Sequence, residues 1–88
     1  LAAKRGVAVE LNGPGGLFGI VHSHLCCAIP NTHYYEYFPG GSRDMAGVKI
    51  GLTNPPLPLE GSIVPPCDPG WGATWDWKYL RSRRIATF

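Results

Sequence analysis

The chain has 88 residues, 44% of them hydrophobic, with eight Lys and Arg against six Asp and Glu and a formal net charge of +2. This length suits one domain at most, and the hydrophobic content argues against a disordered tail. The small charge gives no electrostatic argument for a nucleic acid or a membrane as partner, and we expect neither. No run approaches about 20 apolar residues, so no membrane-spanning helix is predicted.

The three cysteines, Cys26, Cys27 and Cys67, form neither a C-x-x-C pair nor an even disulfide framework. We therefore expect reduced thiols and a cytoplasmic location. A secretory signal, which would combine a charged start with an apolar run, is not predicted. Because the chain opens on Leu1 without an initiator Met, we expect it to be part of something longer.

The first elements are predicted from the positions of glycine and proline and from the spacing of apolar residues. Residues 1–5 read as the end of a helix closed by Gly6, and residues 7–11 as a short strand. A glycine-rich break follows, which is either a tight turn or, less well matched, a phosphate cradle. Apolar residues then recur at helical spacing over residues 17–29, and Pro30 ends that helix.

The next predicted strand spans residues 34–38 and is rich in tyrosine. Two strands joined by a helix of about three turns form a βαβ unit, whose strands are parallel. A lone parallel pair leaves both edges uncovered, so we expect the chain to pack on a larger body or to self-associate. In such folds the chemistry lies at the carboxyl ends of the strands.

The second half of the chain has a different composition. Residues 54–66 are interrupted by prolines around a turn at Glu60-Gly61, and residues 68–72 carry a second turn signal. Thr74 is the predicted N-cap of a short terminal helix that ends in basic residues. We therefore divide the chain into a βαβ portion, 1–41, and a Pro/Gly-rich tail with a short helix, 42–88.

Several residue groups compete as candidates for chemistry. His22 and His24 lie two residues apart, so on a helix they do not converge on one ion, and no metal site is predicted here. The tail interleaves three tryptophans with Lys and Arg, and its prolines satisfy P-x-x-P; both are weak signals for partner binding. Glu36 is the strongest candidate, because it is a carboxylate within a tyrosine-rich strand near its carboxyl end. Buried among aromatic side chains, such a group could hold a proton and donate it, although a structural ion pair is the simpler alternative.

Two stretches carry a resemblance to a known family. HLCCAIPNTHYYE, residues 24–36, and PPLPLEGSIVPPCDPGWGATWDWKYL, residues 55–80, resemble the C-terminal portion of the mandelate racemase and muconate lactonizing enzyme group of the enolase superfamily. The resemblance implies an α/β fold, the C-terminal fragment of a (β/α)8 TIM-type barrel: strand seven, helix seven and strand eight, then a loop-rich tail that packs on a capping domain.

The resemblance also implies a reaction and residue roles. Members remove a proton alpha to a carboxylate with Mg²⁺, and Glu36 aligns with an eighth-strand acid that stabilises the developing charge. Asn12, with Gly13 beside it, would contact substrate where many members carry a histidine base. Asparagine cannot act as that base. The Mg²⁺ ligands belong to barrel strands absent from this chain.

The predicted function is therefore the C-terminal part of an enolase-superfamily lyase or isomerase, most simply an acid-sugar dehydratase, with racemase and cycloisomerase as related outcomes. Its partners would be a small carboxylate substrate and the rest of the barrel or other copies in a homo-oligomer. The isolated chain would be inactive. The alternative is a non-catalytic module that acts through its Pro-rich and Trp/Arg-rich tail.

Overall fold

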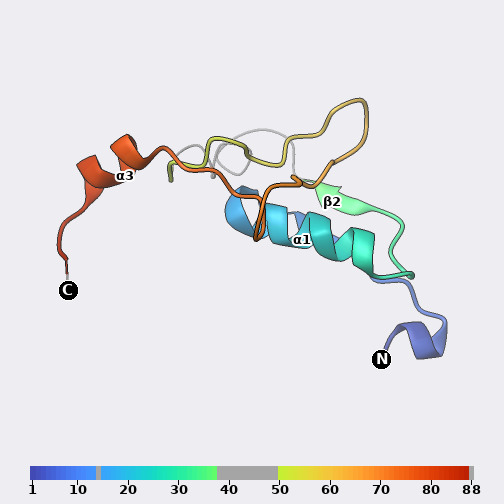
Figure 1. Ribbon diagram of the computed structural model, residues 1–88. Coiled ribbons are helices and arrows are strands. Elements are labelled where there is room, and N and C mark those ends of the chain that lie inside the picture. The colour runs from blue at the N-terminus through green and yellow to red at the C-terminus, as the bar shows by residue number, and fades with distance from the viewer. Residues whose placement is uncertain (14, 38–49, 88) are drawn as a thin grey trace.

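The computed structural model describes residues 1–13, 15–37 and 50–87. In chain order these residues form a 3-10 helix η1 (Ala3–Arg5), strand β1 (Leu11–Gly13), helix α1 (Gly16–Ala28), strand β2 (Tyr35–Tyr37) and helix α3 (Trp77–Arg83). Figure 1 shows α1 lying beside β2, with α3 standing apart near the C-terminus. The predicted α/β class and the βαβ order are confirmed.

The two strands are parallel, as predicted, and pair in the register Leu11↔Tyr35, Asn12↔Glu36 and Gly13↔Tyr37. The predicted first strand, residues 7–11, was set too early. The ladder begins at Leu11, and just before it the Glu10 carboxylate accepts the backbone N–H groups of His33 and Tyr34. Part of the second predicted strand, residue 38, lies outside the described residues, as does the proposed boundary between residues 41 and 42.

Helix α1 begins after Gly15, whose φ of 79° suits glycine, and it ends before Pro30. The face it turns inward consists of Gly16, Gly19, Ile20 and Ser23, all buried. The small residues on this face allow two other segments of the same chain, at Tyr35 and Pro56, to approach the helix closely. A Cβ on Gly19 would lie 2.7 Å from Pro56 Cγ and 2.9 Å from the Tyr35 hydroxyl, so a larger residue there would force one of these side chains to shift.

The tail folds back on itself and on α1. Leu52 pairs antiparallel with Trp75, and the Asn54 side chain bridges this pair of segments, donating to Gly72 O at 2.7 Å and accepting from Thr74 N at 2.9 Å. The turn at Glu60-Gly61 is confirmed by the Leu59–Ser62 bridge that flanks it.

The cap of the terminal helix was predicted wrongly. Asp76, and not Thr74, is the N-cap of α3, with its carboxylate accepting Tyr79 N–H at 2.9 Å. Thr74 is already engaged with Thr53 through both backbone and hydroxyl groups. Because the antiparallel pairing extends to Trp75, the helix cannot begin before Asp76.

The buried core is small and the surface large. Among the described residues the buried hydrophobic side chains are Ile20, 0% exposed, and Leu52, 2% exposed. The radius of gyration is 15.0 Å, against about 12 Å expected for a compact chain of this length. The chain is therefore extended, which agrees with the expectation that a lone βαβ unit leaves surface uncovered.

Candidate site on the parallel strands

Two of the sequence-predicted site residues meet in the structure. Asn12 and Glu36 are register partners on adjacent parallel strands, and Asn12 Nδ2 donates a hydrogen bond to Glu36 Oε2 at 3.2 Å. Each is the central residue of a three-residue strand. The parallel ladder thus brings an amide and a carboxylate, 24 residues apart in sequence, into direct contact in the sheet.

The side chains of this pair lie on the sheet face that α1 does not cover. Tyr35 points to the helix, since its hydroxyl donates to Gly19 O at 3.2 Å. Successive strand residues alternate between faces, so Glu36 points the other way. Glu36 is exposed in the structure.

This geometry corrects the predicted environment of Glu36. The flanking Tyr35 and Tyr37 share the opposite face and do not enclose the carboxyl group. The aromatic residues expected beside Glu36 were those that share its face, residues 34 and 38; Tyr34 is 75% exposed, and residue 38 lies outside the described residues. Glu36 therefore lies on an open sheet face, within reach of whatever covers that face.

Helix α1 also holds the end of β1. His22 Nδ1 contacts the carbonyl oxygen of Asn12. A carbonyl can only accept, so a hydrogen bond here requires the His22 proton on Nδ1. The neighbouring Gly13 is buried, and a Cβ there would collide with the Tyr35 ring. Packing explains this glycine; its predicted substrate contact stays a prediction.

A second polar cluster closes the opposite end of the strands. Glu10 accepts from Tyr34 N at 2.7 Å and from His33 N at 3.2 Å, and its Oε1 lies 3.3 Å from His33 Nδ1. The hydrogen bond from the Tyr34 backbone N–H is the largest cause that lowers the pKa of Glu10 below its ordinary value, and the contacts with His33 add to it. Together they outweigh desolvation, which acts to raise this pKa. Sequence reasoning missed this role; a carboxylate directly before a parallel strand was the available signal.

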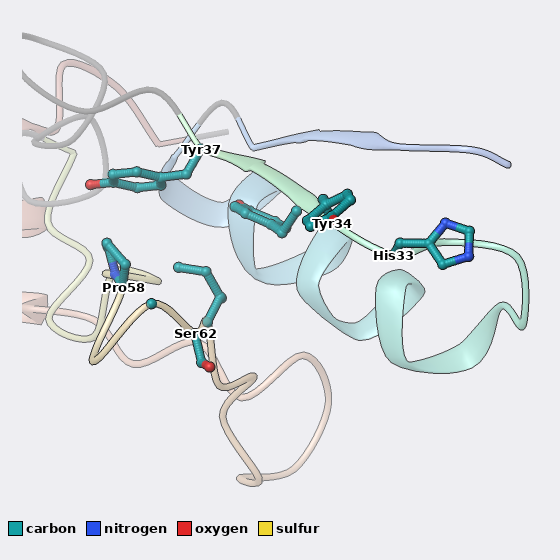
Figure 2. A pocket seen from close by; sticks show the side chains of 8 residues that line it. His33, Tyr34, Tyr37, Pro58 and Ser62 are labelled. Atoms are coloured by element: carbon teal, nitrogen blue, oxygen red, sulfur yellow. The ribbon is translucent and has the colours of Figure 1, made fainter.

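A hollow of about 340 Å³ lies beside β2, away from the Asn12–Glu36 pair. Its lining comes from ring side chains of the β2 segment and from the turn after the prolines: His33, Tyr34, Tyr35, Tyr37, Pro58, Gly61, Ser62 and Ile63. Figure 2 shows Tyr37, Tyr34 and His33 following the strand, with Pro58 and Ser62 across from them. Among the described residues, no carboxylate lines the hollow, so these residues do not supply there the acid chemistry predicted for Glu36.

The described residues do not form a magnesium site. Mg²⁺ prefers a near-octahedral set of oxygen ligands, usually with one or two carboxylates. Within residues 1–13, 15–37 and 50–87 no group of three or more His, Cys, Asp or Glu side chains could hold a metal ion. Asn12 and Glu36 offer one amide and one carboxylate, which are too few to hold the ion by themselves.

Two further observations bear on the sequence predictions. Cys26, Cys27 and Cys67 are free thiols. In the part of the chain that the structure describes, no helix has the length and apolar character needed to cross a membrane.

Comparison with known proteins gave no match to a family model, a curated protein or a solved structure.

Proposed function

We propose that this chain supplies the last strands of a Mg²⁺-dependent enolase-superfamily enzyme that removes a proton alpha to a carboxylate, most simply an acid-sugar dehydratase. The observation that carries the proposal is the Asn12–Glu36 pair, joined at 3.2 Å on one face of parallel strands. These are the residues to which the resemblance assigns substrate contact and acid. The register supports their joint action, because neither could reach the other from different faces.

The open face supports the same proposal. In a parallel barrel the helices cover the outside and the other face of each strand points to the interior. Helix α1 covers the Tyr35 face, which leaves Asn12 and Glu36 on the side that would be interior. Glu36 is exposed here, and the remaining strands of a barrel would enclose it.

In this function Glu36 acts as a hydrogen-bonding acid. A protonated carboxyl can donate to a substrate carboxylate oxygen and stabilise the charge that develops there as the alpha proton leaves. Asn12 holds one carboxyl oxygen through its amide and leaves the other side of the group to the substrate. Asn12 itself cannot accept the alpha proton, so the base comes from another strand.

The proposed partners and location follow from the same assignment. The substrate is a small carboxylate such as an acid sugar, and the rest of the barrel, in the same chain or in an oligomer, provides the metal ligands. Free thiols at Cys26, Cys27 and Cys67 agree with a cytoplasmic setting.

The test uses the complete enzyme that contains these residues, with Glu36→Gln as the variant. We expect turnover of acid-sugar substrates to fall by about 100-fold or more, the scale of losing one charge-stabilising donor. Exchange of the alpha proton with solvent deuterium, followed by NMR, should fall in parallel, since both steps pass through the same charged intermediate.

Glu60→Gln is the matched control, because Glu60 is an exposed glutamate in the turn between Leu59 and Ser62. Its turnover should equal that of the unaltered enzyme. Retention of near-normal turnover by the Glu36 variant would sink the assigned role. A reading frame without further strand–helix units around these 88 residues would contradict the barrel itself.

The alternative, a binding module that acts through its tail, has one supporting observation: Trp77 is 61% exposed on α3, where Arg81 and Arg83 form the last turn. The P-x-x-P segment is less suited to partner binding, because Pro56 is buried against α1. We therefore keep the catalytic proposal first.

A further inference from the structure

The outward face of α1 is apolar and open. At about 100° per residue, the buried residues Gly19, Ile20 and Ser23 centre on one side of the helix. The opposite side carries an outer stripe, defined as Leu17, Phe18, Val21, Leu25 and Ala28. Phe18 is 70% exposed, Leu25 40% and Leu17 36%.

This helix lacks the charged side that a surface helix normally has. Its sequence, GLFGIVHSHLCCA, contains no Asp, Glu, Lys or Arg, and its polar residues His22, Ser23 and His24 are engaged with backbone carbonyl oxygens. A helix at the surface usually presents charges to water, whereas this one presents apolar side chains. The outer stripe therefore has the composition of a contact surface and the exposure of a free one.

The exposed area of the chain is sufficient for a protein interface. The accessible surface is 6552 Å², against about 5,000 Å² expected for a self-contained protein of 9.5 kDa. The difference, about 1,500 Å², is spread over the whole chain, the sheet face opposite α1 included, and it exceeds the roughly 800 Å² that each partner contributes to a standard interface. It therefore leaves room for one interface at α1.

We propose that the outer stripe is a docking surface for a second copy of this chain, with the two α1 helices packed antiparallel about a twofold axis. An isologous contact needs a self-complementary patch, and an uncharged helix meets a copy of itself without like-charge repulsion. With Val21 close to the axis, Phe18 of one copy packs on Leu25 of the other. A lipid surface suits the stripe less well, since interfacial helices carry Lys and Arg beside their apolar face.

The proposal does not depend on the catalytic one. The outer stripe lies on the side of α1 away from the sheet, whereas Glu36 lies on the sheet face away from α1. Both surfaces can be occupied at once. Loss of pairing through α1 would leave the Glu36 assignment intact, and the reverse also holds.

The experiment is sedimentation equilibrium of the 88-residue chain over a range of concentrations, with Phe18→Lys and Leu25→Glu as variants. The unaltered chain should show a monomer–dimer equilibrium, and each variant alone should dissociate at least about tenfold more readily. An equimolar mixture of the two should recover most of the association, because the introduced lysine of one chain then faces the introduced glutamate of the other.

Val64→Lys is the matched control, since Val64 is 71% exposed on the tail and outside the outer stripe. It should dimerise as the unaltered chain does, and circular dichroism should give equal helix content for all variants. Recovery on mixing cannot come from unfolded chains. An unaltered chain that stays monomeric, variants that dimerise normally through the strand edges instead, or a mixture without recovery would each overturn the proposal.

Discussion

Replacement of Gly19 by alanine tests how the tail is held on α1. Alanine is the better helix former by about 1 kcal/mol in a helix interior, so propensity alone predicts stabilisation. The structure predicts the opposite sign. The new methyl group would lie 2.7 Å from Pro56 Cγ and 2.9 Å from the Tyr35 hydroxyl, both closer than carbon contacts allow.

The magnitude follows from what must move. Overpacking of this kind costs about 1–3 kcal/mol. Displacement of the Tyr35 ring also breaks its 3.2 Å hydrogen bond to Gly19 O, which contributes about 1 kcal/mol. After the gain in propensity, Gly19→Ala should lower the free energy of unfolding by about 1–3 kcal/mol.

Urea unfolding followed by tryptophan fluorescence measures this loss. For a small domain with a slope near about 1 kcal/mol per M, the midpoint should fall by about 1 M or more. Tyr35→Phe removes the closest hydroxyl contact, so the double variant should be less destabilised than the two single changes predict together. A Gly19→Ala chain as stable as the unaltered one, or more so, would refute the packing of Pro56 and Tyr35 on this helix.

Three further experiments test the surroundings of Glu10, Tyr35 and Cys26. The pKa of Glu10 is lowered, so the hydrogen bonds to its carboxylate stabilise the fold fully above the ordinary glutamate pKa of 4.5, and this contribution is lost as pH falls through the lowered pKa. In Glu10→Gln, the free energy of unfolding should therefore decrease less on acidification than it does in the unaltered chain. Burial raises the pKa of Tyr35 to about 12, so the part of the stability that comes from its neutral phenol is fully present below about pH 10 and is lost as pH rises toward 12. Tyr35→Phe should remove this alkaline change in stability, and it should remove one late proton from the ultraviolet titration of the tyrosines. Burial also raises the pKa of Cys26, so Cys26 should react with a disulfide reagent more slowly than the exposed Cys27 and Cys67. Replacement of both exposed cysteines by serine should abolish the faster phase. The Glu10 prediction is contradicted if Glu10→Gln loses stability in acid as the unaltered chain does. The Tyr35 prediction is contradicted by an unchanged ultraviolet titration, and the Cys26 prediction by an unchanged fast phase.

Local signals predicted the elements that depend on backbone chemistry. Gly6 closes η1 in the left-handed conformation, with φ of 64°, as a residue after a helix end should. The 17–29 prediction for the helix differs from the observed α1 by one residue at each end. The parallel pairing followed from the length of the connection, since a helical crossover returns the chain in the same direction.

Predictions that required a partner in space were less accurate. Thr74 is a good N-cap by residue type, but it is used by Thr53 and Asn54, and those contacts cannot be read from the local sequence. The apolar residues at helical spacing were also ambiguous. Ile20 faces inward, while Leu17 and Leu25 face outward. The other residues of the inner face are small, namely Gly16, Gly19 and Ser23, so the positions of the large apolar residues do not identify that face.

The candidate site combines both kinds of result. The register that joins Asn12 to Glu36 begins at Leu11↔Tyr35, directly after the Glu10 carboxylate has accepted the N–H groups of His33 and Tyr34. A one-residue shift of pairing would turn Glu36 toward α1 and separate it from Asn12. The Glu10 contacts at the amino end of the strands and the Asn12–Glu36 contact at their centre therefore belong to one register, and a change of that register would disrupt both.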